Sequence, residues 1–129
     1  MRSRFRLTPN QAGEHMAIRR LERSEWPSFC LRASRYFLGK RAEIEALSLE
    51  IGRQVAALRM PILGIDYDPR SDVMQILLRD LEHLIYRPRE LYVDDRPEGL
   101  LSFEVIDADG VQQIIVLSEP LMLPAPRGY

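Results

Sequence analysis

The sequence is poor in the residues that most often carry chemistry. It contains one Cys and two His among 129 residues. A single Cys excludes a disulfide within the chain, and a zinc site would need its other ligands elsewhere. No apolar run approaches the length of a membrane-spanning helix, and no glycine-rich phosphate loop or nucleophile elbow is present. The remaining composition, 46% apolar and 29% charged, is that of an ordinary globular domain.

The charged residues are unevenly distributed. Residues 1–53 carry 11 basic and 6 acidic side chains, whereas residues 54–129 carry 7 and 13. Arg2, Arg4 and Arg6 could contact nucleic acid, but three charges are weak evidence. Because the second half of the chain is acidic, nucleic acid is the least favoured partner.

Both ends of the chain lack regular patterns. Residues 1–17 have no sustained periodicity, so we expect a disordered N-terminal tail, with Met16 as an alternative start. This polar beginning predicts no secretory leader and no membrane association, hence a cytoplasmic location. Residues 119–129 hold three prolines and a Gly, which predicts a Pro-rich C-terminal tail. A single domain is therefore expected over residues 18–118.

A helix is predicted near the start of this domain. Ser24 is a good N-cap, and Gly39 supplies a stop. Between them the apolar residues fall at helical spacing: Trp26, Phe29, Cys30, Ala33 and Phe37. We expect this stripe to bury against a sheet, which makes Cys30 a protonated structural thiol and not a nucleophile.

Period-two alternation predicts strands over most of the remaining chain. The expected strands cover residues 42–46, 54–60, 62–67, 73–78, 84–86, 90–93, 100–106 and 111–117. Pro61 is expected to interrupt pairing at an edge or bulge, and residues 107–110 to close the last hairpin. The predicted fold class is α+β, with one N-terminal helix packed on a curved, mostly antiparallel sheet of six to eight short strands.

Three aspartates, Asp66, Asp68 and Asp72, fall within seven residues. A calcium loop of the EF-hand type counted from Asp66 needs an oxygen ligand where Arg70 stands, and a bidentate Glu that is absent. Asp68-Pro69 instead favours a type I turn, because Pro has the φ that the second position needs. The Asp68 carboxylate can then accept hydrogen bonds from N–H groups two or three residues on. We expect a hairpin turn and no metal.

Several of these motifs occur together in one known group of proteins. They are Trp26-Pro27-x-Phe29, Gly39 before an acidic strand, Gly52-x-Gln54, Gly64-Ile65-x-Tyr67-Asp68-Pro69-x-x-Asp72-x-x-x-Ile76 and Asp109-Gly110. Over residues 18–118 the chain resembles an uncharacterised family of small bacterial proteins, known only as a domain of unknown function. A shorter Tyr-Asp-Pro-x-x-Asp motif is similar to one in a second uncharacterised group. The resemblance implies the domain limits and a bacterial, cytoplasmic setting, and it implies no activity, substrate or catalytic residue.

Two classes of function remain. The absence of catalytic motifs favours a non-enzymatic binding or assembly module without a cofactor. We expect a homodimer, because the strands between residues 100 and 117 are apolar on both sides and one helix covers only part of one face. The alternative to a dimer is a sheet that closes on itself and so covers its second apolar face within one chain.

The alternative is a small-molecule binder or small enzyme that uses Glu43, Glu45 and His83 in a cleft. Carboxylates two residues apart on a strand share a face, and such a pair can raise one pKa for acid–base chemistry. The simpler interpretation is that the two carboxylates lie on the solvent-exposed face of a strand. Convergence of the three side chains at a pocket would favour the alternative.

Overall fold

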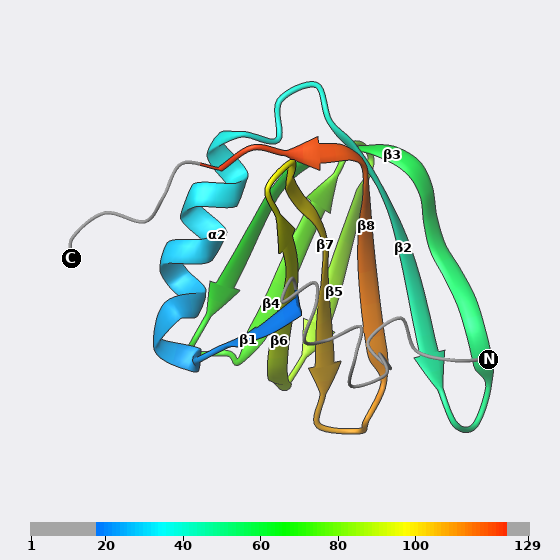
Figure 1. The fold of residues 1–129 in the computed structure, drawn as a ribbon. Coiled ribbons are helices and arrows are strands. Elements are labelled where there is room, and N and C mark those ends of the chain that lie inside the picture. Colours follow the sequence, from blue (N-terminus) through cyan, green and yellow to red (C-terminus); the bar gives the residue numbers. More distant parts are fainter. Residues whose placement is uncertain (1–17, 124–129) are drawn as a thin grey trace, which may run out of the picture.

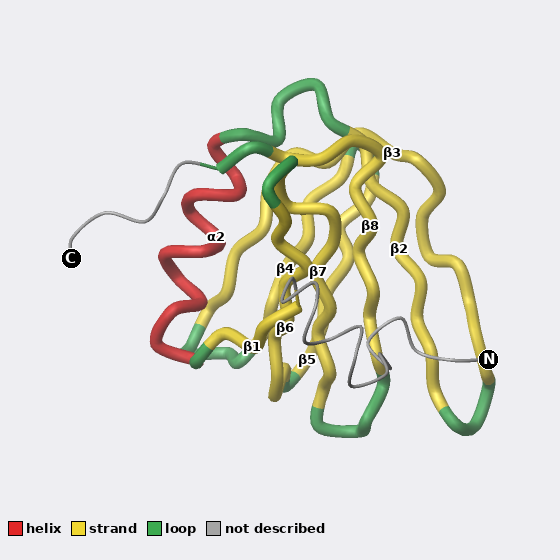
Figure 2. Tube along the Cα trace, in the orientation of Figure 1, coloured by secondary structure: helices red, strands yellow, loops and turns green. Residues whose placement is uncertain are grey.

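A computed structural model describes residues 18–123. These residues form one eight-stranded antiparallel sheet and one α-helix, α2 (Trp26–Arg35), which follows a short 3-10 turn, η1 (Arg23–Glu25). The strands are β1 (Ile18–Leu21), β2 (Arg41–Ser48), β3 (Gly52–Asp68), β4 (Val73–Leu78), β5 (Leu81–Tyr86), β6 (Pro88–Arg96), β7 (Gly99–Asp107) and β8 (Gln112–Leu121). Their order in the sheet is β1-β6-β7-β8-β2-β3-β4-β5, with the helix beside it (Figures 1 and 2).

The predicted sheet and helix are confirmed, with differences in where elements begin and end. The short strand β1 precedes the helix and was not predicted. The predicted N-terminal tail lies outside the described residues, as do residues 124–129. β8 runs on to Leu121, which is buried in the core and pairs with Leu100. Strand β8 therefore extends beyond residue 118, because tertiary pairing holds a segment whose prolines predict a tail.

The long strand β3 changes its neighbour along its length. Residues 52–61 pair with β2, and residues 62–68 pair with β4. Pro61 stands at this change, and its carbonyl accepts a hydrogen bond of 3.0 Å from the N–H of Arg79. The expected change of pairing at Pro61 is therefore present, but the strand itself does not break there. The strand continues through the proline, whose missing N–H falls where one ladder gives way to the next.

The change of partner folds the sheet over without closing it. β5 runs into β6 through Arg87, which has a positive φ of 53°. The imidazole Nε2 of His83 on β5 then lies 2.8 Å from Oε1 of Gln113 on β8. No ladder joins β1 to β5 within the described residues, so the curved sheet stays open.

Helix α2 covers an edge of β3 that has no strand beside it. Residues 62–68 pair with β4 on one side only. On the other side the Ser34 hydroxyl accepts a hydrogen bond from the Ile65 N–H (2.9 Å) and donates one to the Ile65 carbonyl (3.0 Å). One side chain thus satisfies the two backbone groups that a neighbouring strand would otherwise pair.

The predicted apolar stripe is confirmed as the buried face of the helix region. All five of its residues belong to the main core: Trp26, Phe29, Cys30, Ala33 and Phe37. The ring of Phe29 meets that of Phe103 on β7 edge-on, with centroids 5.7 Å apart. Ser24 is not the N-cap. Because β1 ends at Leu21, the turn starts at Glu22, whose N–H donates to Oε1 of Glu25 at 2.9 Å.

Candidate functional site

The β3–β4 turn has the hydrogen bonds that its sequence predicts. Oδ1 of Asp68 accepts the N–H of Arg70 at 3.0 Å, and Oδ2 accepts the hydroxyl of Ser71 at 2.9 Å. The Asp68 carbonyl accepts the N–H of Asp72 at 2.8 Å. The expected hairpin turn is confirmed, and both oxygens of the Asp68 carboxylate are engaged in it.

Replacing Asp68 by Ala is expected to lower the free energy of unfolding by about 0.5–2 kcal/mol, the usual effect of losing a capping side chain. Arg70→Ala in the same turn is the matched control, because only the backbone N–H of Arg70 takes part. Urea unfolding of the two variants measures the difference. Equal losses would show that the Asp68 carboxylate does not stabilise the turn.

Asp72, the third aspartate of the motif, belongs to a polar cluster that joins four elements. Oδ1 of Asp72 accepts the hydroxyl of Tyr67 at 2.7 Å, and the Arg23 guanidinium donates to the same hydroxyl oxygen at 2.8 Å. Arg23 also donates to the Pro88 carbonyl at 2.9 Å, and its guanidinium carbon lies 4.4 Å from the centroid of the Trp26 ring. This cluster ties η1 and α2 to the hairpin and to β6.

The pKa of Tyr67 shows what the cluster does chemically. Burial raises the pKa of this phenol, and the hydrogen bond to the Asp72 carboxylate raises it further. The phenol therefore keeps its proton at neutral pH and remains a hydrogen-bond donor. The arrangement positions segments of the fold and has no activated nucleophile or base.

The three aspartates of the motif do not converge. Asp68 caps the turn and Asp72 binds Tyr67, whereas Asp66 is exposed at a groove beside α2. Among residues 18–123 no group of three His, Cys, Asp or Glu side chains could hold a metal ion.

The structure does not bring Glu43, Glu45 and His83 together. Glu45 on β2 stands opposite Ile114 on β8, so the two side chains share one face of the sheet. Gln113, the residue before Ile114, points to the other face, and there it contacts His83. The two carboxylates and the imidazole thus lie on opposite faces, which removes the cleft that the alternative function requires.

The thiol of Cys30 is buried under the helix. Burial raises its pKa to about 12, and the nearby charge of Asp66 adds to the increase. At neutral pH the thiol is protonated, which suits a packing role.

A group of exposed apolar side chains lies on the β2–β3 hairpin, which stands on the side of the molecule away from α2 (Figure 1). Four of its apolar side chains are exposed, and we call them the hairpin surface: Leu49, Ile51, Val55 and Leu58. Among residues 18–123, the strand beneath them pairs over residues 52–60 with β2 alone, along one edge. Sequence reasoning missed this surface, although four consecutive apolar residues, 55–58, are a signal of a strand that is apolar on both faces.

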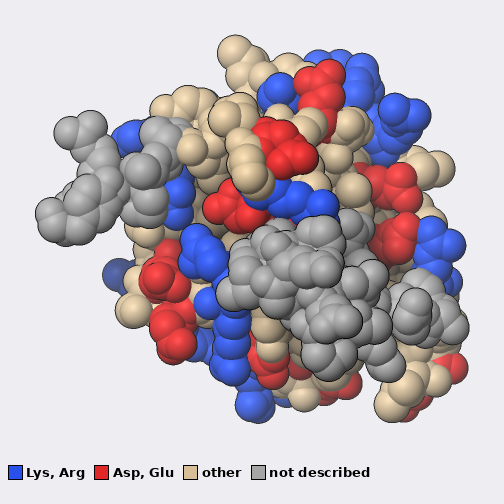
Figure 3. Space-filling view, in the orientation of Figure 1, with Lys and Arg blue, Asp and Glu red and all other residues tan. Residues whose placement is uncertain are grey.

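No helix within residues 18–123 is long and apolar enough to cross a bilayer. On the face shown in Figure 3, acidic and basic side chains are interspersed among the described residues. Neither charge dominates that visible face.

Comparison with known proteins identifies relatives and no activity. The chain is 32% identical over 110 residues to an uncharacterized protein of Aquifex aeolicus (strain VF5), an alignment that covers 84% of this chain and 99% of the relative. No solved structure matches it. The family model of DUF5335, a family of unknown function, matches residues 17–126, and the chain belongs to this family.

Proposed function

We propose that the protein is a non-enzymatic assembly module that forms a homodimer through the free edge of β3. The hairpin surface carries this proposal. Long apolar edge strands with unpaired backbone groups are templates for pairing with another strand. Exposed apolar side chains that gather in one place commonly mark an interaction site, and the four of the hairpin surface lie within ten residues of one another.

The usual protections of an edge strand are only partly present over residues 52–57. Natural edges are blunted by charged side chains, proline or bulges. This stretch contains one charged residue, Arg53, whose guanidinium forms an ion pair with Glu45 on the neighbouring strand. The pairing with β2 shifts register between Val55 and Ala57, and Arg59 has a positive φ of 49°, so the regular part of the edge ends at Val55. The available edge is therefore short, which favours one register of pairing.

A second copy is the occupant that fits this edge best. Two β3 edges can pair antiparallel about a two-fold axis, and each then satisfies the other's unpaired N–H and C=O groups. Such pairing uses the free edge of β3 in both copies, so this contact closes at two chains. The same symmetry brings the two hairpin surfaces to one interface.

Light scattering at micromolar concentration tests the proposal. We expect a mass twice the 15.0 kDa of one chain. Leu58→Lys should shift the equilibrium to monomer by at least about tenfold in Kd, because a lysine on an edge strand opposes pairing. Leu38→Lys is the matched control. Leu38 is 93% exposed in the loop between α2 and β2, and its replacement should leave the dimer intact.

Two results would overturn the assignment. A wild-type mass of 15.0 kDa at these concentrations would show that the chain does not dimerise. A dimer that Leu58→Lys leaves unchanged would place the interface elsewhere.

A further inference from the structure

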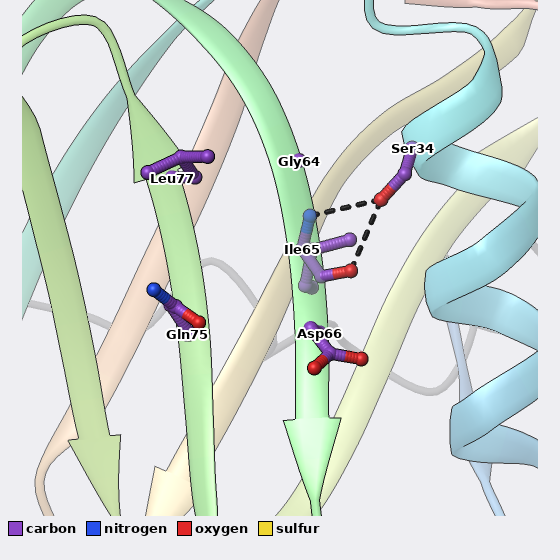
Figure 4. Close-up of a pocket in the computed structure, with 6 residues that line it drawn as sticks. All are labelled: Ser34, Gly64, Ile65, Asp66, Gln75 and Leu77. Atoms are coloured by element: carbon purple, nitrogen blue, oxygen red, sulfur yellow. Dashed lines mark hydrogen bonds between the residues drawn. The ribbon is translucent and has the colours of Figure 1, made fainter.

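A groove lies between the C-terminal half of α2 and the outward face of β3 and β4 (Figure 4). Its volume is about 230 Å³. The lining residues are Ser34, Gly64, Ile65, Asp66, Gln75 and Leu77. Pockets for drug-sized ligands measure about 300–1,000 Å³, so this groove suits one short chain or one side chain.

Gly64 makes room for the groove. Its φ is not positive, so the backbone does not require glycine there. A Cβ at this position would lie 3.6 Å from Oγ of Ser34, an ordinary contact distance. A methyl group at this position would fit against the helix, and with glycine that space belongs to the groove.

The hydrogen-bond donors of the groove are engaged within the protein. The Ser34 hydroxyl donates to the Ile65 carbonyl, and the amide nitrogen of Gln75 donates to the Glu82 carboxylate. Figure 4 shows the Gln75 amide with its oxygen toward β3 and its nitrogen turned away.

Two hydrogen-bond acceptors of the groove, the Asp66 carboxylate and the Gln75 carbonyl oxygen, remain available to a ligand. Asp66 is exposed, and its carboxylate forms no ion pair or hydrogen bond with any described residue. Asp66 and Gln75 stand directly opposite each other on β3 and β4, so their oxygens share one face. The groove thus offers a negative charge and a neutral acceptor, and it calls for a ligand that brings donors and a positive charge.

Apolar side chains border these acceptors. Leu77 lines the groove opposite Gly64 and is 41% exposed. Leu31 lies one helical turn before Ser34 on the same helix face and is also exposed. An alkyl chain laid along this border would be removed from water on one side.

We propose that the groove binds a primary alkylammonium group. The ammonium hydrogens are donated to the Asp66 carboxylate and the Gln75 carbonyl oxygen, and the alkyl chain packs on Leu77. The same chemistry belongs to a free aliphatic amine and to a lysine side chain. The proposal does not depend on dimerisation, because neither β2 nor the hairpin surface contributes to the groove.

Amide proton–nitrogen NMR spectra of the full chain, titrated with n-butylammonium chloride, test the proposal. We expect chemical-shift changes centred on residues 64–66 and 75–77. Neutral n-butanol, which has the same chain length, should bind at least about tenfold more weakly, since a charge-assisted hydrogen bond is stronger than a neutral one.

Two substitutions test separately whether binding depends on the charge of the groove and on its size. Asp66→Asn should weaken n-butylammonium binding about tenfold, whereas Asp95→Asn, the same change at an exposed position on β6, should have no effect. Gly64→Ala should also weaken binding, because it narrows the groove without changing its charge. Absence of shifts at the groove, equal affinity for n-butanol, or unchanged binding by Asp66→Asn would each overturn the proposal.

Two further titrations distinguish the sources of the ammonium group. Tighter binding of Nα-acetyl-lysine N-methylamide would assign the groove to a lysine of a polypeptide. Tighter binding of 1,4-diaminobutane would assign it to a free amine. Either result supports the alkylammonium site.

Discussion

Replacing Phe37 by Ala is expected to lower the free energy of unfolding by about 3–5 kcal/mol, the usual cost of truncating a buried aromatic. The Phe37 side chain is 1% exposed and belongs to the main core, just beyond the end of α2. Its removal leaves a cavity between the helix and the sheet that the surrounding strands fill only in part. Urea or thermal unfolding, followed by circular dichroism, measures the loss.

Tyr36 provides the control for this substitution. It is the adjacent aromatic residue and is 42% exposed, so Tyr36→Ala should cost less than about 1 kcal/mol. A similarly small loss for Phe37→Ala would contradict the packing described for the helix region. A domain of this size has a total stability of about 5–15 kcal/mol, so the Phe37 variant would keep only a fraction of it.

Alkaline pH is expected to destabilise the wild-type protein through Cys30. The folded pKa of this thiol is raised from about 9 to about 12, so between these values the folded state holds a proton that the unfolded state releases. The stabilising contribution is complete below pH 9 and falls as the pH rises towards 12. The slope is about 1.4 kcal/mol per pH unit, which gives a loss of about 3 kcal/mol by pH 11.

Cys30→Ala isolates this contribution. The variant loses packing at every pH, but it has no thiol to titrate, while the tyrosines titrate in both proteins and cancel in the comparison. The free energy of unfolding of the wild type minus that of the variant, measured with urea at pH 8, 9, 10 and 11, should therefore decrease steadily above pH 9. If this difference in free energy stays constant over the range, the pKa of Cys30 is not raised in the folded state.

The sequence predicts those parts of the fold that local chemistry determines. The turns at Asp68-Pro69 and at residues 107–110 are set by side chains and backbone within a few residues, and both hairpins are present. The buried helix stripe follows from its spacing. The buried face of the helix and these two hairpins could therefore be predicted without the structure.

Other features depend on distant pairing, which local pattern does not encode. The strand at Ile18–Leu21 exists because it pairs with β6. Strict alternation would place Leu100 and Phe103 on opposite faces of β7, but a bulge between Leu100 and Ser102 shifts the alternation, and both side chains enter the core.

The candidate sites needed the tertiary structure even more. Alternation shows that Glu43 and Glu45 share a face, but it does not show that His83 reaches the other face of the same sheet. The alkylammonium groove forms only because α2 covers the unpaired edge of β3. No residue pattern within either segment alone specifies that placement.

The pairing of β1 with β6 bears on how the chain is made. Synthesis delivers Ile18–Leu21 first, but its partners, residues 91–94, emerge more than seventy residues later. At about 5–20 residues per second, the first strand waits several seconds on the ribosome without a neighbour. Two of its four residues, Arg19 and Arg20, are charged and exposed even in the finished fold. Such a strand stays hydrated while it waits, and it completes the sheet only after most of the other strands exist.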